Sequence, residues 1–233
     1  MKRFVFTLLI AMSSWLVLPT VYAAPNAFEA VYTVSGKGLT LGTTTVTLHY
    51  QDTHYTYQKS TKANGVAALL SGDTLLERSE GSQSGGNLTP QQYLQEHQSK
   101  RKAKRDSFQF TSATQISGQY NDTPYQLSVP AGTLDAAVME LHLMDNLAAG
   151  KALHYQIASK GKLQDYNFRQ LGKETIEVPA GKYTCEKVEV VHNNGDQHTT
   201  LWLAPDLHYA IVQVNHQENG DVLETRLNHY QTN

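Results

Sequence analysis

The amino-acid sequence predicts a mainly β fold, in which a long curved antiparallel sheet, as a half-barrel or an incomplete barrel, wraps around one principal helix. Three observations predict it. Apolar and polar residues alternate with a period of two along most of the chain, in segments rich in threonine, valine and tyrosine. Glycine, asparagine and aspartate separate these segments at short intervals. Residues 134–149 alone carry a convincing helical spacing of apolar residues.

The N-terminus has the pattern of a cleavable signal peptide over residues 1–23. A basic start at Lys2-Arg3 precedes an apolar run over residues 4–18, and residues 21–23 form a small-residue cleavage site. The run is shorter than the roughly 20 apolar residues that a spanning helix needs. No cysteine stands at the cleavage point for acylation. We therefore expect export to the periplasm without a stable membrane anchor, and a single β-rich domain over residues 24–233.

The first half of this domain is expected to consist of antiparallel strands. The break at residues 35–38 lies between two alternating segments and predicts a hairpin. The strands are expected at residues 28–34, 39–50, 54–61, 74–80 and 92–97.

Residues 64–72 interrupt the strand pattern with a small, apolar stretch that includes Leu69 and Leu70. Either a helical turn or an apolar loop fits this composition. Because the stretch is short and lies between strands, it is the first candidate for a lid or gate over a cavity.

The principal helix is expected over residues 134–149. Thr133 or Asp135 can cap the exposed amides at its start, and Gly150 suits the left-handed conformation that often ends a helix. One face of the helix is expected to pack on the sheet through Leu134, Val138, Leu141 and Met144 or Leu147.

After the helix the chain returns to strands that are joined by compact turns. Asn194-Gly195 is the strongest hairpin signal of the sequence, because this dipeptide favours the turn that matches the strand twist. A meander of antiparallel strands is therefore expected, with hairpins that join residues 186–192 with 198–203 and residues 210–216 with 222–230.

The densest group of charges is the basic run formed by Lys100, Arg101, Lys102, Lys104 and Arg105. On a strand, the three lysines would point to one face and the two arginines to the other, so the run forms one patch only in a loop. One interpretation is an exposed strand edge that the charges protect from aggregation. The other is a contact with anionic headgroups or acidic glycans.

Several kinds of chemistry are not expected from the sequence. His192 and His198 flank the predicted hairpin turn without a third ligand, so we expect no metal site. Residues 81–85 have glutamine where a nucleophilic serine would stand, and we expect no catalytic residues and no cofactor. Cys185 has the setting of a buried, inert thiol. The net charge of −2 does not favour nucleic acid as a partner.

A family resemblance covers nearly all of the chain after the predicted signal peptide. It is carried by the Pro-Ala-Gly turn within residues 171–188, by Trp-Leu-Ala-Pro-Asp at residues 202–206 and by Ile-Val-Gln-Val at residues 211–214. Residues 28–32, 41–43 and 88–93 also contribute. These segments resemble the bacterial domain-of-unknown-function 3108 family. The resemblance implies an exported β-rich envelope protein and no established catalytic residues.

A curved sheet with a helix in its mouth makes a natural apolar cavity. Together with export, this predicts a noncatalytic binding protein for a lipid or other amphiphile, linked to envelope maintenance. Tyr183, Trp202 and Tyr209 are the expected wall residues, with Leu69 and Leu70 at the gate. Two alternatives stay open: a module that docks on an envelope protein or on peptidoglycan, and a hydrolase of envelope glycans or lipids.

Overall fold

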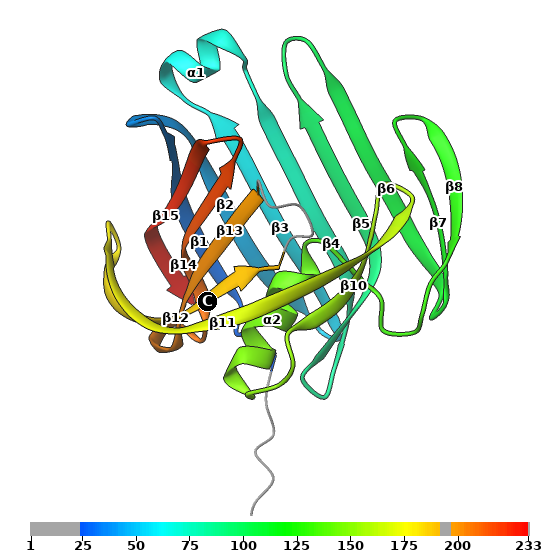
Figure 1. The fold of residues 1–233 in the computed structure, drawn as a ribbon. Coiled ribbons are helices and arrows are strands. Elements are labelled where there is room, and N and C mark those ends of the chain that lie inside the picture. Colours follow the sequence, from blue (N-terminus) through cyan, green and yellow to red (C-terminus); the bar gives the residue numbers. More distant parts are fainter. Residues whose placement is uncertain (1–23, 192–196, 233) are drawn as a thin grey trace, which may run out of the picture.

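The structure is a computed structural model that describes residues 24–191 and 197–232. Its strands form one sheet in the order β8-β7-β6-β5-β4-β3-β2-β1-β15-β14-β13-β12-β11-β10-β9 (Figure 1). The elements are β1 (Phe28–Gly36), β2 (Leu39–Gln51), β3 (His54–Ala63), α1 (Gly65–Leu70), β4 (Thr74–Ser84), β5 (Asn87–Gln98), β6 (Ala103–Ser112), β7 (Gln115–Tyr120), β8 (Thr123–Ser128), β9 (Leu134–Asp135), α2 (Val138–Ala148), β10 (His154–Ser159), β11 (Lys162–Val178), β12 (Gly181–Val190), β13 (Gln197–Ala204), the 3-10 helix η1 (Pro205–Leu207), β14 (Ala210–Glu218) and β15 (Asp221–Thr232).

The sheet is open, because β8 and β9 are its two edges and do not pair with each other. Its β9–β10 pair is parallel, and the other neighbouring strands that pair in the described chain run antiparallel. In Figure 1, β10 and β11 cross in front of the wall formed by β3 to β6, with α2 between them. The predicted long, curved antiparallel sheet with one principal helix is therefore confirmed.

The β10–β11 hairpin is held against strands β6 and β8 by hydrogen bonds to side chains, not by strand pairing. The backbone amide of Lys160, in the β10–β11 turn, donates to Oδ2 of Asp106 on β6 at 2.6 Å. The hydroxyl of Tyr125 on β8 donates to Oδ1 of the same carboxylate at 3.1 Å. Because Asp106 is buried, its two bonded oxygens hold the hairpin against the inner face of the sheet.

The inner face of the sheet carries the core. Phe28, Ala30 and Tyr32 alternate along β1 and are all buried, as the period of two predicts. Tyr55 and Tyr57 are buried in the same way on β3. The helix α2 covers part of this face with six buried side chains, Val138, Met139, Leu141, Leu143, Met144 and Leu147.

The start of the principal helix differs from the prediction. Leu134 and Asp135 form the short strand β9 beside β10, and α2 begins at Val138. The backbone of these two residues bonds to a strand, but Asp135 still caps the helix, because its Oδ1 accepts the amides of Ala137 at 3.0 Å and Val138 at 2.8 Å. Gly150 adopts a φ of 62° after the helix, as predicted.

Three other parts of the chain can be compared with the prediction. Residues 65–70 form the short helix α1, which has no buried residue. The sequence pattern did not single out β7 and β8, which the structure places at one edge of the sheet. The predicted signal peptide at residues 1–23, His192 and the Asn194-Gly195 turn lie outside the described residues. Within the described residues, no helix has the length and hydropathy needed to cross a membrane.

Gly81, where the register of β4 and β5 shifts, tests how closely these strands pack. A Cβ at this position would lie 2.0 Å from the Thr89 carbonyl oxygen and 2.8 Å from Cε1 of Tyr55. We expect Gly81→Ala to lower the free energy of unfolding by about 1–3 kcal/mol, because the backbone must move to admit the methyl group. Urea unfolding measures the change, with Ser82→Ala as the neighbouring control. Equal stability of the two variants would contradict the close packing.

Candidate functional site

Two adjoining cavities lie on the inner face of the sheet. The α1 cavity, about 600 Å³, includes Ala67 and Ser71 of the α1 region in its lining. The α2 cavity, about 220 Å³, is lined in part by Glu140 and Met144 of α2. Thr61 and Leu75 line both of them, so the two cavities meet at this point. Together they form a path along the inside of the curved sheet.

The α1 cavity has one apolar wall and one polar wall. Strands β1, β2 and β15 and the helix α1 supply the apolar wall, with Val34, Leu41, Leu223 and Ala67. Strands β5 and β6 and the β10–β11 turn supply the polar wall, with Gln95, His97, Lys104, Asp106 and Lys160. A cavity of this kind suits a ligand that is itself amphipathic, because each of its parts meets a wall of matching chemistry.

The α2 cavity is largely apolar, but it contains a partly buried cluster of charges. Lys59 on β3 lies with its Nζ 2.8 Å from Oε2 of Glu77 on β4 and 2.6 Å from Oε1 of Glu140 on α2. The hydroxyl of Tyr57 donates to Glu140 at 2.9 Å, and that of Tyr93 donates to Glu77 at 2.7 Å. The apolar part of the lining includes Phe28, Tyr32, Val46, Ile211 and Val214.

The electrostatics of this cluster favour the charged forms of Lys59 and Glu77. Burial acts to lower the pKa of Lys59, but the carboxylates of Glu140 and Glu77 outweigh it and raise that pKa above its ordinary value. Burial acts to raise the pKa of Glu77, yet the Lys59 ammonium and the Tyr93 hydroxyl hold it below its ordinary value. Both glutamates are bound to the same lysine, so the cluster fixes the positions of β3, β4 and α2 relative to one another.

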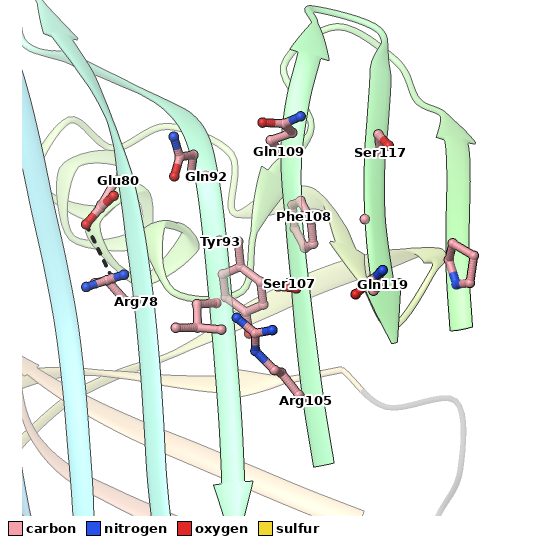
Figure 2. Close-up of a pocket in the computed structure, with 13 residues that line it drawn as sticks. Arg78, Glu80, Gln92, Tyr93, Arg105, Ser107, Phe108, Gln109, Ser117 and Gln119 are labelled. Carbon is pink, nitrogen blue, oxygen red and sulfur yellow. Dashed lines mark ion pairs between the residues drawn. The ribbon is translucent and has the colours of Figure 1, made fainter. Parts of the chain in front are cut away.

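A third, shallower site lies on the other face of the sheet (Figure 2). It has a volume of about 430 Å³, and its polar lining includes Gln92, Gln109 and Gln119 from three strands. Its charged side chains are paired, since Arg78 contacts Glu80 at 3.3 Å and Arg105 contacts Glu96 at 3.0 Å. This surface offers hydrogen-bonding groups without an excess of either charge.

No group of three histidine, cysteine, aspartate or glutamate side chains in the described residues could hold a metal ion. The buried Cys185 has a pKa raised by burial to about 11, and its Sγ donates to the carbonyl oxygen of Tyr183 at 3.7 Å. At neutral pH this cysteine is therefore a thiol and a weak nucleophile.

Comparison with protein families shows to which family the chain belongs. The family model described as "Protein of unknown function (DUF3108)" matches residues 31–224. The chain belongs to the DUF3108 family. The resemblance inferred from the sequence is thus confirmed. Among curated proteins, none matches this DUF3108 chain.

One solved structure supports the same fold for this DUF3108 protein. A β-barrel-like protein of the domain of unknown function DUF1849 from Brucella abortus has a TM-score of 0.59 at 7% identity, over 91% of this chain and 99% of that chain. At this identity the similarity concerns the fold alone. A protein from Parabacteroides distasonis named as a lipoprotein has a TM-score of 0.40 at 8% identity, over 91% of this chain and 98% of that chain.

The aromatic residues expected in the cavity wall of the DUF3108 chain lie outside the lining of the two cavities. Trp202 is opposite Lys187 and Gln213, whereas its neighbour Leu201 is opposite Val214, which lines the α2 cavity. Trp202 therefore faces the other side of the sheet, where its Nε1 donates to Glu174 at 3.1 Å. Tyr183 and Tyr209 are half-buried, and none of these three aromatic residues is among the lining residues of either cavity in the described chain.

The expected gate residues lie on α1, and the residues of the basic run lie partly in a turn and partly on β6. Leu69 and Leu70 of α1 are 74% and 75% exposed, beside the α1 cavity rather than inside it. Lys100, Arg101 and Lys102 lie at the β5–β6 turn, and Lys104 and Arg105 on β6 are both among the lining residues of the α1 cavity. The structure thus does not form one flat patch from the five basic residues, since Arg105, next to Lys104 on the strand, forms an ion pair with Glu96.

Proposed function

We propose that this DUF3108 protein binds a lipid or other amphiphile, without catalysis, in the path formed by the α1 and α2 cavities. One observation carries the proposal: an α1 cavity of about 600 Å³ with an apolar and a polar wall continues into a mostly apolar cavity. This volume falls within the range of roughly 300–1,000 Å³ that is usual for small-molecule sites.

The walls indicate how such a ligand lies. Its apolar part contacts Val34, Leu41 and Leu223 and extends past Leu75 toward the α2 cavity. Its polar part lies near Lys104 and Lys160. Removal of apolar surface from water supplies the affinity, at about 25 cal/mol for each Å² that the ligand and the wall bury together.

The place of action in this proposal is the periplasm. The basic start, the short apolar run and the cleavage pattern of residues 1–23 support export. A carrier or sensor of amphiphiles in that compartment would contribute to maintenance of the cell envelope, because lipids must cross an aqueous space between membranes.

A bulky residue at the junction of the two cavities tests the proposal. The mature protein is purified from the periplasm without detergent, extracted with organic solvent, and examined by mass spectrometry for lipid near one molecule per chain. We expect Leu75→Trp to lose this lipid, because Leu75 lines both cavities. Leu76→Trp is the matched control, since the next side chain along the strand points to the other face of the sheet.

The outcomes separate the candidate functions. Stoichiometric lipid in the wild type and in Leu76→Trp, with loss in Leu75→Trp, supports a carrier or sensor. A wild type without lipid that also fails to bind a fluorescent acyl probe contradicts the proposal. Crosslinking in whole cells would then test docking on an envelope protein or on peptidoglycan.

A further inference from the structure

The exposed large apolar side chains of the described residues are concentrated at one end of the sheet. Six of the nine, Leu39, Val66, Leu69, Leu70, Val222 and Leu223, belong to the start of β2, to α1 and to the start of β15. We call these six residues the apolar rim. Gly36 at the end of β1 lies opposite both Leu39 and Leu223, so β2 and β15 begin beside the same residue. In Figure 1 this is the end of the sheet where α1 lies.

The apolar rim is continuous with the α1 cavity. Leu223 is both a rim residue and a lining residue of the cavity, and Ala67 of α1 lines it between the exposed Val66 and Leu69. Isolated exposed apolar residues are ordinary on protein surfaces, whereas a contiguous group at the mouth of a cavity marks an interaction site. Val66, Leu69 and Leu223 therefore lie beside the entrance that a ligand would use, whereas Val222, next to Leu223 on β15, points to the other face of the sheet.

Hydrogen bonds hold α1 in its exposed position. The amide of Asn64 donates to the carbonyl oxygen of Leu41 at 2.9 Å, and its side chain donates to Thr43 at 2.6 Å. At the other end, the amide of Lys100 donates to the carbonyl oxygen of Ser71 at 3.0 Å, and the ammonium of Lys100 donates to the carbonyl oxygen of Leu69. The helix is thus fixed between β2 and the β5–β6 turn, with its apolar side chains in solvent.

Cations lie at the same end of the sheet. Lys100, Arg101 and Lys102 at the β5–β6 turn are exposed. In the described part of the chain, no carboxylate forms an ion pair with any of these three. Exposed apolar side chains next to unpaired cations are the combination that binds the interface of an anionic bilayer.

We infer that the apolar rim and the basic β5–β6 turn dock the protein on a bilayer that contains anionic phospholipid, with the α1 cavity open to the membrane. This inference rests on the proposed function, because it gives the ligand a route between bilayer and cavity. The leucines of α1 enter the interface, and Arg101 and Lys102 contact phosphate groups. A bilayer fits the rim better than a protein does, because cations without ion pairs lie beside the exposed leucines of α1, next to the cavity.

Flotation of the mature protein with vesicles tests the inference. Vesicles of phosphatidylglycerol with phosphatidylcholine are compared with vesicles of phosphatidylcholine alone, at low and at high salt. We expect Leu69→Asp with Leu70→Asp to weaken binding to the anionic vesicles by at least about tenfold, because two apolar side chains no longer leave water. Leu163→Asp with Leu171→Asp, at exposed apolar positions of β11, is the matched control and is expected to bind like the wild type.

A second pair of variants examines the cations. Arg101→Glu with Lys102→Glu keeps Lys100, which fastens α1, and is expected to abolish the difference between anionic and neutral vesicles. Unchanged flotation of both pairs of rim variants, or no flotation of the wild type, overturns the inference. So does a rim variant that floats normally but loses a crosslink to an envelope protein, since the rim would then be a protein interface.

The same preparations separate this inference from the proposed function. Leu75→Trp is expected to float with the vesicles although it carries no lipid, and Leu69→Asp with Leu70→Asp is expected to bind the fluorescent acyl probe from solution although it does not float. Wild-type protein that floats through its rim but never carries lipid would refute the proposed function and leave the docking surface standing.

Discussion

Replacement of Lys59 by methionine is expected to lower the free energy of unfolding by about 3–5 kcal/mol, because it leaves two carboxylates without their shared cation. Glu77 is only 6% exposed, and it cannot regain the water that would solvate its charge. Methionine fills a similar volume, so the change removes charge more than packing. Urea unfolding at neutral pH, followed by circular dichroism, measures the difference.

Two further variants make this result specific. Lys62→Met changes an exposed lysine on the same strand and is expected to alter stability by no more than about 0.5 kcal/mol. Lys59→Met combined with Glu77→Gln and Glu140→Gln is expected to be more stable than Lys59→Met alone, since no uncompensated charge is then buried. If Lys59→Met unfolds at the same urea concentration as the wild type, the cluster contributes nothing to the fold.

The cluster also shows what sequence reasoning could have found. Lys59 follows Tyr55 and Tyr57 at the spacing of two, so the pattern that predicts a buried face for the tyrosines also places this lysine on the inner side. A lysine there needs a partner of opposite charge. The identity of one partner, Glu140, could not be read from the sequence, because it lies 81 residues away on α2.

The sheet itself was largely predictable. Period-two alternation gave the correct inner face for β1, where Phe28 and Tyr32 are buried, and short turns gave the antiparallel order. The crossing of β10 and β11 over strands β3 to β6 could not be predicted from the sequence, because it depends on contacts such as the one between Lys160 and Asp106. Such contacts join segments that have no pattern in common.

The predicted wall residues show the limit of composition. Aromatic residues such as Trp202 suit both the wall of a cavity and the core between a sheet and a segment that covers it. The end of the β11–β12 hairpin folds across the other face of the sheet, where the amide of Ala180 donates to the carbonyl oxygen of Leu227 at 3.0 Å. The direction in which the whole sheet curves decides which face lines the cavity. The sequence of a single strand does not determine that direction.

Replacement of Asp135 by asparagine is expected to stabilise the protein at pH 8 by up to about 4 kcal/mol and to leave its stability at pH 4 nearly unchanged. Burial is the main cause that raises the pKa of Asp135 to about 7, against the hydrogen bonds from Ser79, Ala137 and Val138 that lower it. In the unfolded chain an aspartate has a pKa of about 3.9.

The direction of this pH dependence follows from the number of protons that Asp135 binds in the folded and in the unfolded chain. Between pH 4 and pH 7 the folded chain keeps a proton on Asp135 that the unfolded chain has lost, so stability from this group is full below pH 4 and falls as the pH rises to about 7. Asparagine keeps the oxygen that accepts the helix amides and carries no charge at any pH. Its amide can donate to Ser79, whose hydroxyl can turn to the hydroxyl of Tyr55, 2.9 Å away.

Urea unfolding at several pH values between 4 and 8 gives the test. The slope of stability against pH is expected to be smaller in Asp135→Asn than in the wild type, but not zero, because burial also raises the pKa of Asp145 to about 7. Asp145→Asn is the companion variant, and the two substitutions together are expected to reduce the slope further than either does alone. An equal gain or loss in Asp135→Asn at pH 4 and at pH 8 would mean that this carboxyl is ionised in the folded protein throughout the range, and that the three hydrogen bonds outweigh its burial.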